Sequence, residues 1–176
     1  MTREIPESIE REIRLALSFY PDLEDTSIDF RFKENIRKST MLAQPRWSSF
    51  FRLNDRSYII LISRKFKISN EEFYTKDIPS KVLVGWIGHE LGHITDYETL
   101  SKWGLIKFGF NYLFSDKHIK QAEFRADQFA IHHGMLEYIL ETKNFILNHA
   151  NISERYKNHI KKYYLSPEQI MEMVDN

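Results

Sequence analysis

The apolar positions near the start of the chain follow the period of an α-helix. Ile9, Ile13 and Leu17 are spaced by four residues, and Glu and Arg fill many of the positions between them. Such spacing gathers the apolar side chains on one side of a helix and leaves the charged ones on the solvent-facing side. The pattern predicts an amphipathic helix over residues 6–20, which Pro21 ends.

The chain then changes to short segments rich in β-branched and aromatic residues. Four such segments lie at 27–32, 39–44, 46–53 and 57–63. Runs of this length and composition predict β-strands. The Asn-Asp-Arg sequence at 54–56 is typical of a tight turn between the last two. We therefore expect a small, mostly antiparallel sheet, in which the very apolar segment 57–63 is a central strand.

Helical patterns dominate the rest of the chain. Residues 64–79 are charged and contain Asn70 and Pro79, so we expect a connecting loop there. The spacing of apolar and aromatic residues then predicts a long helix over 81–100, with Ser80 as its N-cap. Further helices are predicted at 116–133, which Gly134 would close, and at 135–149, 153–165 and 167–174.

The order of helix, small sheet and then helices is typical of an α+β fold. With 176 residues, of which 42% are apolar, the chain can build one sizeable core and is too short to suggest two. We predict a single domain over 1–176. Residues 1–100 would form its upper part with the sheet and the long helix, and residues 101–176 a helical lower part.

Composition narrows the classes of partner and cofactor. The 25 basic and 25 acidic residues balance, which argues against nucleic acid as a partner. The chain has no cysteine, so any zinc must be held by imidazole and carboxylate groups. The absence of cysteine suits a reducing compartment, and the charged first residues do not resemble an export signal. We expect a cytoplasmic protein, and the oligomeric state stays open.

The most apolar stretch lies at 103–114 and is aromatic. It contains Lys107 and is shorter than the roughly 20 residues that cross a bilayer as a helix, so we expect no stable membrane insertion. Its aromatic residues either fill a core between two helices or form a wall facing a substrate or a membrane surface. Core packing is the commoner role for such a run, and we predict it here.

The candidate chemistry begins with the sequence His-Glu-Leu-Gly-His at 89–93, inside the predicted long helix. Residues four apart share a helical face, with about 5–6 Å between their β-carbons, so His89 and His93 can both reach one zinc ion. Glu90 lies about 100° round the helix from His89, where it can contact a bound water without ligating the metal. The spacing predicts two ligands and a general base.

A catalytic zinc site usually needs a third protein ligand. The sequence Gln-Ala-Glu-Phe-Arg-Ala-Asp at 121–127 offers two carboxylates one helical turn apart. Glu123 can be the third ligand, and Asp127 can accept a hydrogen bond from a ligating imidazole and fix its tautomer. Ala126 is small where two helices must approach closely.

Together these motifs resemble those of the gluzincin metallopeptidases. His-Glu-x-x-His followed by Glu-x-x-Ala-Asp is similar above all to the minimal soluble members, the minigluzincins, which are similar to the catalytic domains of integral-membrane HtpX-like and CAAX-prenyl peptidases. The resemblance covers the two motifs and the order of elements, and none of the long apolar spans of the membrane members is present. It implies a zincin-like fold with these roles: zinc ligands His89, His93 and Glu123, base and acid Glu90, and Asp127 as support for His89.

The resemblance further implies a zinc-dependent endopeptidase acting on peptides or unfolded protein segments. Zinc activates a water and polarises the scissile carbonyl, while Glu90 takes up a proton and returns it to the leaving amine. Segments 57–63 and 46–53 are the candidates for a rim strand that pairs with the substrate. Gluzincins also stabilise the oxyanion with a Tyr, His or Arg. We select Tyr156 from the candidates Arg155, Tyr156, His159, Tyr163 and Tyr164.

Two other interpretations stay open. A latent or catalytically inactive metal-binding module could use the same fold for interaction, although such a module has no need of Glu90. A helical protein without metal would leave His89 and His93 as partly buried helix residues, and Glu123 and Asp127 on a charged face. The remaining histidines are interpreted as structural or surface residues: His118, His132, His133 and His149.

Overall fold

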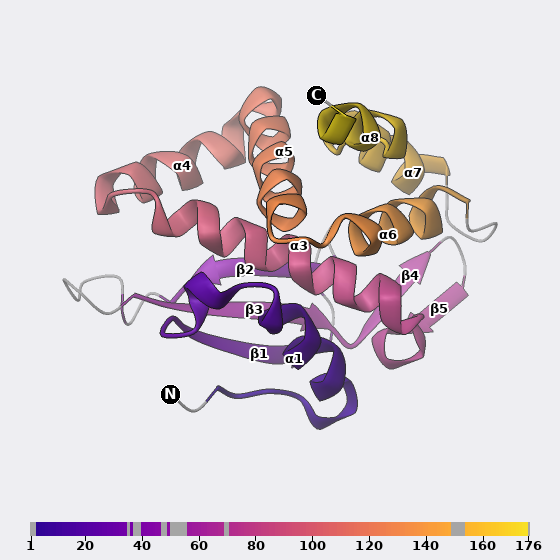
Figure 1. Ribbon diagram of the computed structural model, residues 1–176, viewed down its shortest axis with the longest axis horizontal. Helices are drawn as coiled ribbons and strands as arrows, with labels where there is room; N and C mark the ends of the chain where they lie inside the picture. Colours follow the sequence, from indigo (N-terminus) through magenta and orange to yellow (C-terminus); the bar gives the residue numbers. More distant parts are fainter. Residues whose placement is uncertain are drawn as a thin grey trace.

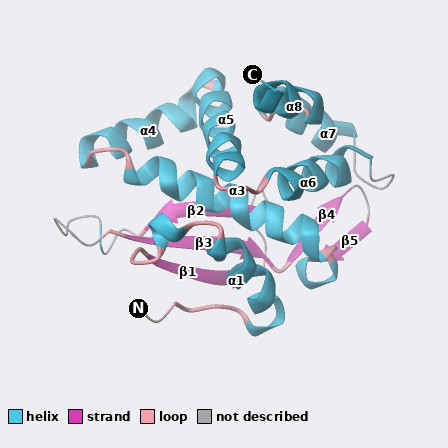
Figure 2. Ribbon diagram, in the orientation of Figure 1, coloured by secondary structure: helices cyan, strands magenta, loops and turns pink. Residues whose placement is uncertain are grey.

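The computed structural model shows an α+β fold in which one long helix separates a small sheet from a group of helices. Figure 1 shows helix α3 crossing the middle of the molecule, with the three-stranded sheet on one side and α4 to α8 on the other. Figure 2 shows the same division by type of secondary structure. The structure describes residues 3–34, 36, 40–46, 49, 56–68, 71–148 and 154–175.

The amino-terminal helix predicted over 6–20 is confirmed. It starts as a 3-10 turn, η1 (Glu7–Ile9), and continues as α1 (Glu10–Ser18). Ile9 and Ile13 are fully buried, and this face of α1 packs on α3. A second 3-10 turn, η2 (Pro21–Leu23), then leads into the sheet.

The main sheet has the order β1-β3-β2, with bounds β1 (Ser27–Lys33), β2 (Met41–Pro45) and β3 (Ser57–Ser63). Strands are confirmed for segments 27–32, 39–44 and 57–63, and the last of these is central as predicted. Most of segment 46–53, and most of the turn at 54–56, lies outside the described residues.

The sheet is mixed, whereas the sequence predicted a mostly antiparallel one. Strand β3 pairs antiparallel with β2 on one edge and parallel with β1 on the other. Because β1 and β2 run in opposite directions, the strand between them is parallel to one and antiparallel to the other. One face of β3 is covered by the core, where Tyr58, Ile60 and Ile62 have no exposed surface.

The predicted loop at 64–79 is wrong, because half of its residues form two paired strands. Strands β4 (Lys65–Ile68) and β5 (Glu71–Tyr74) pair antiparallel, and a 3-10 turn, η3 (Thr75–Asp77), follows. The register sets Lys67 opposite Glu72. The charge that suggested a loop is therefore compatible with a two-stranded ribbon.

Helix α3 (Ser80–Glu98) is buried along almost its whole length, from Val82 to Tyr97. It packs on β2 and α1, and also on α5 and α6. The predicted helix is confirmed, but Ser80 is its first residue and makes no capping bond. The Ser80 hydroxyl instead donates to Glu12 Oε1 at 2.8 Å.

The carboxy-terminal part consists of five further helices in the described residues. Gly134, with φ of +82°, separates the second and third of them and serves as the predicted end of its helix, since glycine adopts this left-handed conformation without strain. The helices predicted at 116–133, 135–149, 153–165 and 167–174 are confirmed within a few residues, whereas the first of the five, at 102–114, was not predicted as a helix. The bounds are α4 (Lys102–Phe114), α5 (Asp116–His132), α6 (Leu136–Asn148), α7 (Glu154–Tyr163) and α8 (Pro167–Asp175).

The core role predicted for the aromatic run 103–114 is wrong for its outer residues. The run forms α4, and Leu105 on its inner side is 7% exposed, while Trp103 is 81%, Phe110 64% and Phe114 73% exposed. The helix lies at the margin of the molecule, so only one of its sides meets the core. Within the described residues, no helix has the length and apolar character needed to cross a membrane.

Candidate metal centre

Helix α3 supplies the first two residues of the centre. His89 and His93 lie one turn apart on the same side of α3, with ring centroids 4.8 Å apart. Both are buried, although imidazole groups are usually at least partly exposed to water. Their burial follows from the position of α3 between layers, which turns this side of the helix toward α5.

Helix α5 supplies two carboxylates, from Glu123 and Asp127, again one turn apart. The two helices approach closely because Gly92 of α3 lies against Ala126 of α5. A β-carbon added at Gly92 would lie 2.3 Å from the Ala126 carbonyl oxygen, which is closer than any real contact allows. The small residue predicted at 126 therefore allows the crossing that brings Glu123 and Asp127 to the histidines.

Three possible ligand atoms converge at this crossing. Glu123 Oε2 lies 3.0 Å from His89 Nε2 and 3.5 Å from His93 Nε2. Ligand atoms held at about 2.0–2.1 Å from a tetrahedral metal ion are separated by about 3.3 Å, and the two distances from Glu123 Oε2 are close to this value. All three ligand atoms lie within 4.8 Å of one another. Among the described residues, His89, His93 and Glu123 form the one group of three or more His, Asp or Glu residues arranged in this way.

Asp127 contacts His89 from behind and is itself held by a buried lysine. Asp127 Oδ1 lies 2.8 Å from His89 Nδ1, and its Oδ2 lies 2.9 Å from Lys143 Nζ on α6. With the Nδ1–H of His89 held by Asp127, its Nε2 faces Glu123 Oε2 and would offer its lone pair to a metal ion once it loses its proton. Lys143 is only 4% exposed, and no motif in the sequence marked it as part of the site.

Tyr112 of α4 fixes the orientation of the Glu123 carboxylate. Its hydroxyl donates to Glu123 Oε1 at 2.8 Å, so the other oxygen is left toward the histidines. Burial, and then the Glu123 charge, raises the pKa of Tyr112, which keeps the phenol protonated as a donor. Sequence reasoning missed this residue, because it treated the aromatic run only as apolar surface.

Glu90 lies near enough to His89, His93 and Glu123 for their charges to act on it, and its carboxylate points to the sheet. Its Oε2 accepts a hydrogen bond of 2.7 Å from the backbone N–H of Ala43 in β2. Burial raises the pKa of Glu90, and the neighbouring His93 and His89 only partly oppose this effect. A carboxylate with a raised pKa beside a metal centre is suited to taking up a proton.

The electrostatics of the centre favour a bound cation. Burial would raise the pKa of Glu123 and of Asp127, but His93 and His89 hold the first well below its usual value, and Lys143 and His89 lower the second. Burial opposes protonation of His89, yet Asp127 and Glu123 outweigh it and raise its pKa to about 10. Two buried carboxylates thus remain ionised and draw positive charge to the histidines.

The selection of Tyr156 cannot be assessed, because its side chain lies outside the described residues, as do those of Arg155 and His159. Tyr163 is turned elsewhere, since its hydroxyl donates to Asp116 Oδ1 at 2.7 Å. The fifth candidate, Tyr164, has its ring centroid 5.6 Å from that of His89. Of the described candidates, Tyr164 is thus the one beside the centre.

Neither rim strand can be assigned as the sequence suggested. Segment 57–63 is the central strand β3, whose two edges are already paired, and segment 46–53 lies mostly outside the described residues. The strand beside α3 is β2, which is at the edge of the sheet and carries Ala43. Sequence reasoning missed β2 because an edge is a property of the strand order.

Comparisons with known proteins identify no relative of the chain. No known protein family matches the chain, and no match was found among curated proteins or solved structures. The function therefore has to be inferred from the residues and the geometry of the centre.

Proposed function

We propose that the chain is a zinc-dependent endopeptidase of the gluzincin type with a zincin-like fold. The observation that carries this proposal is the convergence of the ligand atoms of His89, His93 and Glu123 within 4.8 Å of one another, with Glu90 beside them. Two imidazoles and one carboxylate form a donor set that suits catalytic zinc, and the described residues around it include the supports that such ligands require.

The residues of the chain have distinct tasks in the proposed reaction. His89, His93 and Glu123 would hold a zinc ion, which would supply an activated water and polarise the scissile carbonyl. Glu90 accepts the proton of the attacking water and returns it to the leaving nitrogen. The Ala43 N–H orients the Glu90 carboxylate during both steps. Asp127 and Tyr112 hold His89 and Glu123 in their orientations from outside the centre.

The edge strand β2 is the proposed platform for the substrate. An extended peptide could add to this edge through backbone hydrogen bonds, which would bring its scissile bond over α3. We assign the stabilisation of the oxyanion to Tyr164, which lies close to His89, and Tyr156 stays a prediction. Backbone pairing selects an extended shape more than particular side chains, so peptides or unfolded segments are the expected substrates.

The alternative is a latent or inactive metal-binding module, and one observation favours it. The residues of the centre are all enclosed: His89, Glu90 and His93 are 6–8% exposed and Glu123 is 2% exposed. The Glu90 carboxylate is also engaged by Ala43. A peptide would have to displace part of this arrangement to reach the ligands, so the same centre could serve binding without turnover.

The test compares wild type, Glu90→Gln and the exposed control Glu141→Gln. We expect all three to bind zinc, and cleavage of a quenched casein-like substrate to fall by about 10²–10⁴-fold in Glu90→Gln alone. A chelator should abolish the cleavage by wild type. Zinc binding without any cleavage would support the module instead, and full activity of Glu90→Gln would refute the role of Glu90.

A further inference from the structure

The outer side of helix α4 carries a continuous apolar surface. Trp103, Ile106, Phe110 and Phe114 are 81%, 47%, 64% and 73% exposed. Their spacing of three, four and four residues places them along one side of the helix over about 16 Å. The rings of Phe110 and Phe114 pack together, with centroids 4.7 Å apart. We call these four residues the α4 face.

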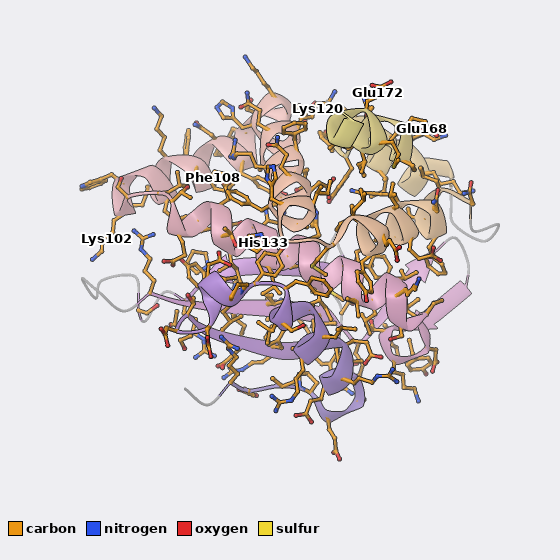
Figure 3. The ribbon with its side chains drawn as sticks, viewed as in Figure 1. Lys102, Phe108, Lys120, His133, Glu168 and Glu172 are labelled. Carbon is orange, nitrogen blue, oxygen red and sulfur yellow. The ribbon has the colours of Figure 1, made fainter. Side chains whose placement is uncertain are left out.

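The α4 face is not needed to hold the helix in the fold. The opposite side of α4 already packs inward through Leu105, Phe108 and Tyr112. Figure 3 shows Phe108 between α4 and α3, whereas Lys102 projects away from the body of the molecule. Large exposed apolar patches on a folded protein usually mark an interaction site, because burying them stabilises a complex and exposing them to water is unfavourable.

Lysine residues flank the α4 face. At about 100° per residue, Lys102 and Lys107 lie on the two margins of the face. Lys117 and Lys120 follow in the first turns of α5. Between residues 101 and 120 the chain has one acidic residue, Asp116, and Lys162 Nζ contacts it at 2.6 Å. The chain as a whole has no net charge, so this segment, with four lysines and one acidic residue, is more positive than the average of the chain.

We propose that the α4 face docks on an anionic phospholipid surface, with α4 lying in the plane of the interface. An apolar side rich in Trp and Phe with lysines on both margins has the character of a helix that lies in this way. Trp favours the boundary between lipid tails and head groups, and lysine stems follow the apolar surface while the ammonium groups reach the phosphates.

A second copy of the chain fits this face less well. Two-fold pairing of the α4 face would bring the lysines on its margins close to those of the other copy, and like charges repel at such a contact. An anionic surface matches the same lysines favourably. Docking would also bring the metal centre near the membrane, because Tyr112 on the inner side of α4 bonds to Glu123. The docking itself does not depend on the proposed peptidase activity.

The test measures sedimentation of the full chain with large unilamellar vesicles. We expect binding to vesicles of equal parts phosphatidylglycerol and phosphatidylcholine, and much weaker binding to phosphatidylcholine alone. Changing Lys102 and Lys107 together to Gln should weaken binding roughly thirtyfold, at about 1 kcal/mol for each lysine near the surface. The control pair Lys33→Gln and Lys81→Gln removes the same charge from other elements and should bind like wild type.

The apolar contribution is tested with Trp103→Ser combined with Phe110→Ser, which should weaken binding at least about tenfold. Leu15→Ser, at a residue of α1 that is 37% exposed, is the matched control. Trp103 also reports its own environment, so its fluorescence should shift to the blue on binding, and Trp103→Phe should bind without that shift. Thermal unfolding checks that each variant is folded.

Three results would overturn the proposal. The first is no sedimentation with the anionic vesicles. The second is equal binding by wild type and by the serine variant of the α4 face. The third is self-association in the absence of lipid that this serine variant abolishes, which would make a second copy the occupant. No peptide substrate is present in any of these measurements, so their outcome is independent of the cleavage test.

Discussion

Helices α3 and α4 follow each other in the chain and differ in which side chains they bury and which they expose. Helix α3 buries residues that usually lie in water, and α4 exposes residues that usually lie in a core. Position decides this contrast, since α3 runs between two layers and α4 lies at the margin. The buried residues are His89, Glu90, His93 and Asp96, and the exposed ones are Trp103, Phe110 and Phe114.

Two buried carboxylates at the crossing of α3 and α5 are compatible with folding because each has a positively charged partner. Asp96 accepts two hydrogen bonds of 3.0 Å from Arg125 Nε, and Asp127 contacts both His89 and Lys143. Without such partners, burial of a charge is strongly unfavourable. Replacing such pairs by apolar residues is often neutral or stabilising, so the presence of this network is not by itself a sign of high stability. The exposed apolar residues of α4 carry no comparable penalty.

The largest effect on stability is expected from Lys143→Met, which removes the buried ammonium group from the Asp127 carboxylate and leaves it His89 as its charged partner. The free energy of unfolding of the metal-free protein should fall by about 3–5 kcal/mol, as measured by urea denaturation. Combining it with Asp127→Asn should restore part of the loss, because the carboxylate charge is then removed as well.

Lys81→Met is the control for that change. Lys81 Nζ lies 3.8 Å from Glu137 Oε2, and both side chains are largely exposed, so its loss should change stability by less than about 1 kcal/mol. If Lys143→Met unfolded at the same urea concentration as Lys81→Met, the buried pair would contribute nothing to the α3 and α5 crossing.

A smaller effect is expected at the glycines of the two helices. Gly92→Ala places a methyl group 2.3 Å from a backbone oxygen of α5 and should destabilise the protein by about 1–3 kcal/mol. Gly109→Ala in α4 meets no atom within 4 Å and should stabilise by about 0.5–1 kcal/mol, as alanine favours helices. Denaturation curves check both, and a stabilising Gly92→Ala would contradict the close crossing.

The smallest effect is expected on the α4 face. Trp103→Ser and Phe110→Ser should each change the free energy of unfolding by no more than about 0.5 kcal/mol. Leu105→Ala, on the inner side of the same helix, should cost about 2–5 kcal/mol. Thermal or urea unfolding of the three variants compares the two sides directly. A large loss of stability in Trp103→Ser would mean that the outer side of α4 is packed against other residues.

Local patterns predicted the parts of the molecule that depend on residues close in sequence. The helical period located α1, α3 and α5, and the four-residue spacings set His89 near His93 and Glu123 near Asp127. We expected the two pairs to meet because a catalytic zinc site usually needs a third ligand and because the motifs resemble those of the gluzincins. The structure brings them together through the small residues Gly92 and Ala126.

The rest depends on contacts between distant segments, which a pattern does not contain. Lys143 and Tyr112 reach the centre from α6 and α4, and neither stands in a recognisable motif. The edge position of β2 follows from the strand order. Burial of α4 could not be judged from its apolar residues alone, because the helix is apolar on both its inner and its outer side.

The central claim, that His89, His93 and Glu123 bind a metal ion, is tested most directly by metal content. Wild type, Glu90→Gln and Glu123→Ala would be purified without metal-affinity resin, incubated with excess zinc and dialysed. The zinc content of each protein would then be measured by elemental mass spectrometry. Stoichiometric zinc is expected in wild type and Glu90→Gln, with a large loss in Glu123→Ala, since one of three ligands is removed. Wild type without bound zinc, or Glu123→Ala with as much zinc as wild type, would contradict the assignment of the centre.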